Sequence, residues 1–239
     1  MNRNKAVKWL LFFVLLLNAN RMNAQNNTDR LNAQQQGLAS ISALTATGDL
    51  ENLKPRFNSA LDAGLSINEI KEALTQLYAY CGFPRSLNAI GTFKAVLDER
   101  KTKGISDDVG KEIVVENNVV DKYEQGRKVL EALTKMPQVK PAPGFGEFAP
   151  RIDAFLKEHL FADIFVCDVL TYQQRELVTI AALAAMTGVE PQLQAHIGMG
   201  MNTGITKEQI EEICSIIEKN ISKQQADSAR NVLSKIKKN

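Results

Sequence analysis

Residues 62–69 read Asp-Ala-Gly-Leu-Ser-Ile-Asn-Glu, and residues 202–209 read Asn-Thr-Gly-Ile-Thr-Lys-Glu-Gln. Both stretches fit the same corner between two helices. Gly64 and Gly204 can take the left-handed conformation that closes a preceding helix. A hydroxyl residue two positions later, with Glu or Gln three residues further on, forms a capping box that starts the next helix. Two copies of one corner predict two copies of one helical unit.

The corner belongs to a longer repeat, in which the second copy follows the first by 140 residues. Residues 31–77 align without a gap on residues 171–217, and the glycines and turns fall at equivalent points. Apolar residues then follow each corner with the three-and-four spacing of an amphipathic helix. They are Ile70, Ala73, Leu74 and Leu77 in the first copy, and Ile210, Ile213, Ile216 and Ile217 in the second.

The remaining segments also favour helices. Residues 123–135 and 149–165 have helical patterns, and residues 136–150, with four prolines and two glycines, are typical of a loop. Residues 171–174 form a further capping box, which starts an alanine-rich helix able to pack closely on a neighbour. Residues 114–120 are β-branched but interrupted by polar residues, so we predict no strand there. The predicted fold class is all-α, with two tandem helical bundles related by the internal repeat.

The first 24 residues have the layout of a signal peptide. Basic residues precede an apolar run from Trp9 to Leu17, which is shorter than the roughly 20 residues that span a bilayer. We predict cleavage near Ala24 and a secreted or periplasmic mature chain; the alternative is an uncleaved N-terminal anchor. The predicted first repeat then covers residues 25–106. Residues 107–237 hold a connecting helix, the proline-rich loop and the second repeat.

Charge and cysteine content exclude several classes of function. Removal of residues 1–24 takes away four basic residues and no acid, so the formal net charge falls from +2 to −2. A chain without a basic run is not expected to bind nucleic acid, and no other segment is apolar enough to cross a membrane. Three cysteines are too few for a disulfide framework, which leaves one disulfide with a free thiol, or three buried thiols. Two histidines 37 residues apart make a histidine-based metal site unexpected.

Several segments resemble the carboxymuconolactone decarboxylase family, whose wider group includes the alkylhydroperoxidase D-like proteins. Residues 148–161 (FAPRIDAFLKEHLF) resemble its lead-in helix, and residues 170–183 (LTYQQRELVTIAAL) resemble its signature helix. The pattern continues with residues 194–196 (QAH) and 204–210 (GITKEQI), and in the first copy with residues 69–74 (EIKEAL). Residues 80–84 (YCGFP) are similar to the family's tyrosine-x-glycine-phenylalanine-proline segment. The resemblance covers most of the mature chain.

The resemblance implies a helical bundle that assembles into trimers or hexamers, so we expect a homo-oligomer, most simply a trimer. It also implies a pocket lined by a glutamate and a histidine, which are Glu176 and His196 in this chain. The aligned positions in the first copy hold Gln36 and Arg56. Conversely, the second copy lacks the Tyr80–Pro84 corner. We therefore expect one composite site, in which this corner forms part of the wall around Glu176 and His196.

The chemistry of these residues suggests proton transfer. An imidazole gives or takes a proton near neutral pH, and a nearby carboxylate orients it and raises its basicity. We expect His196 and Glu176 to be the catalytic residues of a cofactor-free carboxy-lyase that acts on a small carboxylated or lactone substrate. Decarboxylation needs neither a metal nor an organic cofactor when the released electrons delocalise into the substrate. The expected substrate-binding residues are Arg85, as an anion contact, with Tyr80, Cys81 and Phe83.

Two alternative functions remain open. The first is thiol-dependent peroxide reduction, since the resemblance extends to a peroxidase branch that has a Cys-x-x-Cys pair before the motif histidine. In this chain Val189 and Gln192 occupy those positions, so this reaction is disfavoured. The chain could also be a noncatalytic binding or assembly module, with His196 as a hydrogen-bonded core residue.

Arg175 is adjacent to Glu176 in the sequence, but its side chain is expected to point about 100° away from that of Glu176 on a helix. We therefore expect Arg175 either to form an ion pair or to reach a subunit interface.

Overall fold

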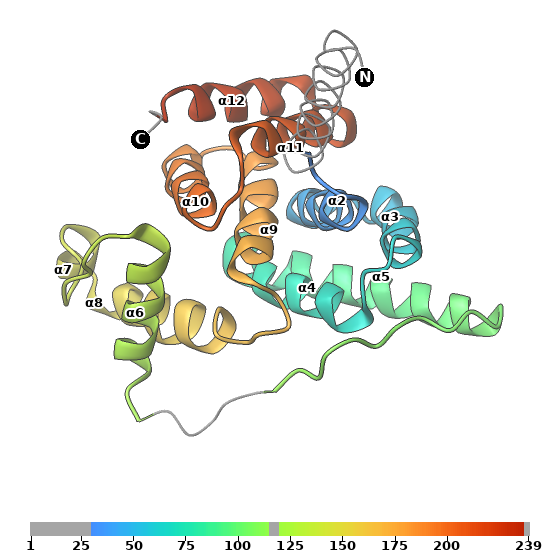
Figure 1. Cartoon of the computed structure of the whole chain (residues 1–239), viewed down its shortest axis with the longest axis horizontal. Coiled ribbons are helices and arrows are strands. Elements are labelled where there is room, and N and C mark those ends of the chain that lie inside the picture. The colour runs from blue at the N-terminus through green and yellow to red at the C-terminus, as the bar shows by residue number, and fades with distance from the viewer. Residues whose placement is uncertain (1–29, 115–119, 237–239) are drawn as a thin grey trace, which may run out of the picture.

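The computed structural model describes residues 30–114 and 120–236, and every regular element in these ranges is a helix, which confirms the all-α prediction (Figure 1). The first copy comprises α2 (Ala33–Thr47), α3 (Leu50–Asp62), α4 (Ile67–Cys81) and α5 (Phe83–Thr102). The second comprises α9 (Tyr172–Ala184), α10 (Glu190–Asn202), α11 (Lys207–Asn220) and α12 (Lys223–Ser234). Between them lie α6 (Lys122–Thr134), α7 (Phe145–Phe148), α8 (Pro150–Ala154) and the π-helix η1 (Phe155–Ile164). The predicted signal peptide lies outside the described residues.

The two predicted corners have the expected conformation. Gly64 and Gly204 adopt φ angles of +91° and +100°, in the left-handed region that glycine enters without steric cost. Ser66 and Thr206 cap α4 and α11, and each takes part in a complete capping box. Helices α3 and α10 therefore end, and α4 and α11 begin, at positions 140 residues apart. The internal repeat is a structural repeat.

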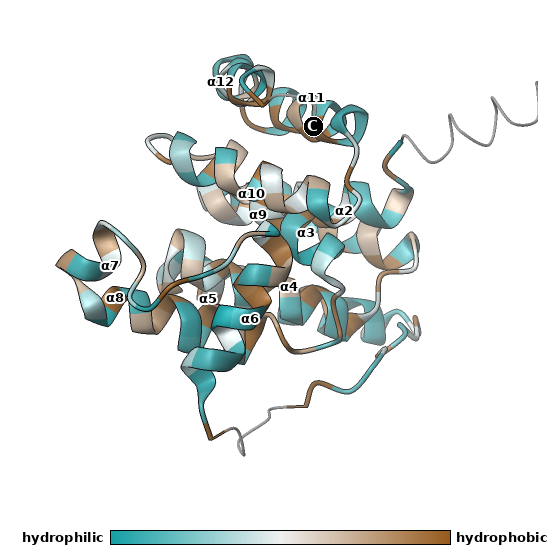
Figure 2. Cartoon of the chain, turned by 60° about the vertical axis from the view of Figure 1, so that its left-hand side comes forward, coloured by the Kyte–Doolittle hydropathy of each residue, from teal (hydrophilic) through white to brown (hydrophobic). Residues whose placement is uncertain are grey.

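The two copies are interleaved around one core. Helices α2 and α9 lie side by side at the centre; α4 of the first copy packs on α9, and α11 of the second packs on α2 (Figure 1). One apolar cluster runs through both copies, from Leu38 and Ile41 to Ile180 and Ile213. Figure 2 shows apolar residues along α4 and α9 in the middle of the molecule. Because a helix of each copy packs on the central helix of the other, residues of different copies can lie in one site.

The segment between the copies forms a second, smaller cluster. Helix α6 packs on η1 so closely that a Cβ atom on Gly126 would lie 1.8 Å from the backbone oxygen of Lys157. The Lys157 side chain is buried and pairs with Asp153, which also accepts a hydrogen bond from the Tyr123 hydroxyl at 2.5 Å. These buried polar groups satisfy one another and fix α6, α8 and η1 together.

Two details differ from the sequence-based expectation. Residues 149–165 are not one α-helix, because the chain widens after Ala154 into a π-helix, as in the hydrogen bond from the Phe165 amide to the Leu160 carbonyl. The proline-rich loop contains the short helix α7. This helix starts after Gly144, which takes a φ of +74° and whose backbone N–H donates a hydrogen bond to the Glu147 carboxylate.

The expectation of no strand at 114–120 falls largely outside the described residues. No helix among the described residues is long and apolar enough to cross a membrane.

Candidate functional site

Glu176 and His196 meet between α9 and α10. The imidazole Nδ1 lies 2.8 Å from Glu176 Oε2, and the glutamate side chain is completely buried. The His196 side chain is nearly buried as well and keeps 9% of its surface exposed. Because an ionised carboxylate only accepts hydrogen bonds, the proton of this pair sits on Nδ1. The Nε2 atom is then the free end of the dyad.

The free end faces the first copy. The Tyr80 hydroxyl, at the end of α4, lies 3.5 Å from His196 Nε2, and the two rings meet edge to face with their centroids 5.3 Å apart. Burial and the neighbouring Glu176 carboxylate raise the pKa of the Tyr80 phenol far above its usual value, against the smaller lowering effects of Thr179 and Arg175. Tyr80 is therefore a neutral hydrogen-bond donor at any ordinary pH.

A glycine lets α10 approach α9 at the dyad. Gly200 lies one turn after His196, and a Cβ atom there would stand 2.8 Å from Ile180 Cδ1 and 3.6 Å from Glu176 Cβ. A larger residue would push α10 away from α9 at the height of the carboxylate. The second oxygen of that carboxylate, Glu176 Oε1, is buried and has no hydrogen-bond partner among the described residues.

A buried polar network joins α4 to α9 beside the dyad. The Arg175 guanidinium is fully buried; it donates to Glu72 Oε2 and Gln76 Oε1, at 3.0 Å in both cases, and to the Cys167 carbonyl. The Gln76 amide donates in turn to the Arg175 carbonyl at 2.9 Å and to the Thr179 hydroxyl at 2.8 Å. Of the two roles expected for Arg175, the structure shows the ion pair. The network fixes α4, and with it Tyr80, against the helix that carries Glu176.

The position in the other half of the molecule that is equivalent by the 140-residue repeat holds different residues. Gln36, Arg56 and Asn220 align with Glu176, His196 and Tyr80. Arg56 Nη2 donates to Asn220 Oδ1 at 3.0 Å, whereas the Gln36 amide turns away to the Leu31 carbonyl. Residues Gln35, Glu212, Ile216 and Ala39 stand where the network has Arg175, Glu72, Gln76 and Thr179. The acid–base groups and the network thus occur together, in one half.

The described contacts of the predicted binding residues Cys81 and Phe83 are with residues other than Glu176 and His196. Cys81 Sγ donates to the Leu77 carbonyl at 3.1 Å within its own helix. Phe83 is 61% exposed and stacks on Tyr78, with ring centroids 4.3 Å apart. Of the expected wall, Tyr80 is the residue that contacts His196.

Arg85 is held at the opposite end of the central helices. Its guanidinium donates to the Ala46 carbonyl at 2.6 Å and lies 3.9 Å from Met186 Sδ, beyond the last turn of α9. Because α9 rises about 12 Å between Glu176 and Ala184, this contact is well separated from the dyad. The role of Arg85 as an anion contact remains a prediction.

The three cysteines are free thiols. Burial raises the pKa of Cys81 and of Cys167, and it raises the pKa of Cys214 to about 12. Thiols with raised pKa values are poor nucleophiles at neutral pH, since the thiolate is the reactive form. Nothing in this arrangement prepares a cysteine for peroxide reduction.

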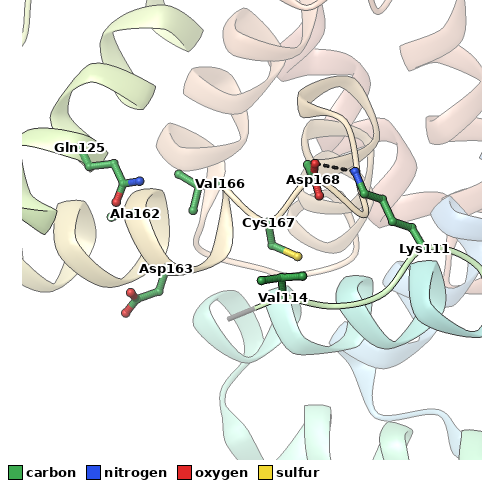
Figure 3. Close-up of a pocket in the computed structure, with 8 residues that line it drawn as sticks. All are labelled: Lys111, Val114, Gln125, Ala162, Asp163, Val166, Cys167 and Asp168. Carbon is green, nitrogen blue, oxygen red and sulfur yellow. Dashed lines mark hydrogen bonds and ion pairs between the residues drawn. The ribbon is translucent and has the colours of Figure 1, made fainter. Parts of the chain in front are cut away.

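A separate pocket of about 300 Å³ lies beside η1 (Figure 3). Two of its lining residues, Lys111 and Asp168, form an ion pair with their charged atoms 2.5 Å apart, and the Cys167 side chain lies next to Val114 (Figure 3). None of the predicted site residues is among its described lining. The pocket adjoins the polar network through Cys167 and is distinct from the dyad.

Comparison with known proteins agrees with the repeat. A model of the carboxymuconolactone decarboxylase family matches residues 15–95 and again residues 150–233, which together make up more than half of the chain. The chain therefore belongs to the carboxymuconolactone decarboxylase family, as a member with two tandem copies. No curated protein matches it. The domain boundaries at residues 106 and 107 remain a prediction.

Proposed function

We propose that this protein is a cofactor-free lyase that removes a carboxyl group from a small carboxylated lactone or a related substrate. The observation that carries the proposal is the contact between Glu176 and His196, in which a buried carboxylate lies 2.8 Å from Nδ1, so that Nε2 is on the side of the ring away from the carboxylate. This arrangement fixes the tautomer and the orientation of the imidazole. A proton is therefore held at one defined point of the site.

Such a site can complete a decarboxylation. The bond between the substrate carbon and its carboxylate breaks, carbon dioxide leaves, and the electron pair delocalises as an enolate toward the lactone carbonyl. His196, as the imidazolium, donates its Nε2 proton to the enolate carbon next to the lactone carbonyl, and solvent then restores the proton on His196. The Glu176 carboxylate stabilises the imidazolium before the transfer.

The thiol-dependent alternative has less support. Val189 and Gln192 occupy the positions of the redox pair, and the pKa values of all three cysteines are raised. The expected homo-oligomer and the secreted or periplasmic location belong to the same proposal. Light scattering of the mature protein at micromolar concentration tests the first of these, and a monomer alone would contradict it.

Turnover of carboxymuconolactone and related carboxylated lactones tests the function. Carbon dioxide release is compared for the wild type, His196→Gln and Glu176→Gln, with His159→Gln as the matched control. His159 is exposed and pairs with Asp163 at 2.9 Å, away from the dyad. We expect a loss of about 100-fold or more in kcat for the two dyad variants and none for the control. Equal rates for His196→Gln and the wild type would refute the assignment, and absence of wild-type turnover across the set would favour a noncatalytic module.

A further inference from the structure

Tyr80, which belongs to the first copy, contacts the Nε2 end of His196. Its hydroxyl lies 3.5 Å from His196 Nε2 and its ring stands edge-on to the imidazole. Glu176 is fully buried behind His196, while Tyr80 and His196 both keep some exposed surface. Because the Tyr80 hydroxyl lies 3.5 Å from Nε2, a substrate atom in contact with Nε2 also lies close to that hydroxyl.

The surroundings hold this hydroxyl in place. Glu72, Gln76 and Tyr80 follow one another at four-residue intervals along one face of α4. The first two are fixed to α9 by the buried bonds of Arg175 and Thr179. The other half of the molecule has Glu212, Ile216 and Asn220 at these positions, so it has neither the network nor the phenol. A phenol kept neutral can donate a hydrogen bond but does not add a negative charge to the site.

We propose that Tyr80 is a catalytic residue, whose hydroxyl donates a hydrogen bond to the oxyanion that forms on the substrate as carbon dioxide leaves. This inference rests on the proposed function and deepens it. The electron pair of the broken carbon–carbon bond moves to the lactone carbonyl oxygen, and Tyr80 stabilises that oxygen without giving up its proton. His196 supplies the one proton that carbon needs. The site is thus divided between the copies, with the proton donor in the second and the oxyanion donor in the first.

Removal of the hydroxyl alone tests the proposal. Tyr80→Phe keeps the ring, and Tyr78→Phe is the matched control, since Tyr78 lies on the same helix but stacks on Phe83. With carboxymuconolactone as substrate, Tyr80→Phe is expected to lower kcat by about 100-fold with little change in KM. The control is expected to keep the wild-type values. Thermal unfolding of each variant shows that the fold is intact.

Binding of 4-nitrophenolate, a planar oxyanion, provides a readout that does not depend on turnover. At mildly alkaline pH we expect Tyr80→Phe to bind it about 10-fold more weakly than the wild type, and Tyr78→Phe to bind it equally. If His196→Gln is inactive while Tyr80→Phe keeps full kcat, the inference is wrong and the proposed function stands. If the wild type turns over no lactone, the proposed function fails. Equal phenolate affinity of the wild type and Tyr80→Phe then overturns the oxyanion role as well, and a weaker affinity of Tyr80→Phe supports it.

Discussion

Arg56 donates a hydrogen bond to Asn220 across the two copies, at the positions that His196 and Tyr80 occupy in the other half of the molecule. The same pair of repeat positions is therefore in contact in both halves of the molecule, each time between one copy and the other. In one half the contact joins an imidazole to a phenol above a buried carboxylate. In the other it joins a guanidinium to an amide, neither of which exchanges a proton near neutral pH. The fold offers two equivalent places, and the residues suit proton transfer in one of them.

The ion pair between Arg175 and Glu72 is expected to matter strongly for stability. Both side chains are buried, so Arg175→Met would leave the Glu72 carboxylate without its counter-charge. We expect a loss of about 3–5 kcal/mol in the free energy of unfolding, measured by urea denaturation. The double variant Arg175→Met with Glu72→Leu should recover much of this loss, because no unpaired charge remains. An Arg175→Met variant as stable as the wild type would contradict this account.

Two glycines of α10 form a matched pair for testing the approach of that helix to α9. Gly200→Ala places a Cβ atom 2.8 Å from Ile180 Cδ1 and should cost about 1–3 kcal/mol, with reduced turnover because His196 shifts from Glu176. Gly198 has no neighbouring atom within 4 Å of such a Cβ, so Gly198→Ala should be neutral or stabilising by up to about 1 kcal/mol. Thermal unfolding distinguishes the two. Equal effects of the two substitutions would show that Gly200 is not required for the close approach of α10 to α9.

The thiols are expected to react slowly. Because burial raises the pKa of Cys81, Cys167 and Cys214, each holds less thiolate at neutral pH than a free cysteine does. Their reaction with a maleimide should be slow at pH 7 and accelerate as the pH rises. Peroxide consumption with a thiol donor should be absent and unaffected by Cys81→Ser. A peroxidase activity that disappears in Cys81→Ser would reverse the order of the two functions.

Acid is expected to weaken the segment between the copies. Burial raises the pKa of Asp153, but hydrogen bonds from Lys157 and Tyr123 outweigh burial, so the pKa lies below its usual value. A lowered folded-state pKa gives stability that is present above the unfolded value of about 4 and is lost as the pH falls through the folded one. Asp153→Asn should therefore lower the unfolding temperature at pH 7 and flatten its decrease toward acid pH. An unchanged acid profile would show that Asp153 has no such role.

Most of the fold was accessible from the sequence, because its signals are local. The capping boxes at Ser66, Thr171 and Thr206 and the left-handed glycines at the corners depend on a few adjacent residues. The π-helix η1 was missed, since a shift from four- to five-residue hydrogen bonding leaves the apolar spacing almost unchanged. The packing of α4 on α9 and of α11 on α2 was also out of reach, because it depends on contacts between distant residues.

The site could be predicted in part. The resemblance points to Glu176 and His196, and comparison of the two copies points to the segment with Tyr80; the structure shows that these three side chains contact one another in sequence. Glu72 and Gln76 were missed, although two polar residues at four-residue spacing before Tyr80, within an otherwise apolar face, were a usable signal. Arg85 and Phe83 were expected near the dyad from their place in the motif, yet their contacts are made elsewhere. Phe83 and Arg85 are close to Tyr80 in the sequence but contact other residues, because the chain turns at Gly82 from α4 into α5.

Decarboxylation in deuterium oxide tests the central claim most directly. The wild type is incubated with carboxymuconolactone in deuterium oxide, and NMR locates the deuterium on the carbon next to the lactone carbonyl, which the electron pair reaches through the ring double bond. Proton delivery by a fixed His196 predicts one deuterium on a single face of that carbon, and its formation should slow by about 100-fold or more in His196→Gln. Deuterium on both faces in the wild-type product, or the wild-type rate and face in His196→Gln, would contradict the account.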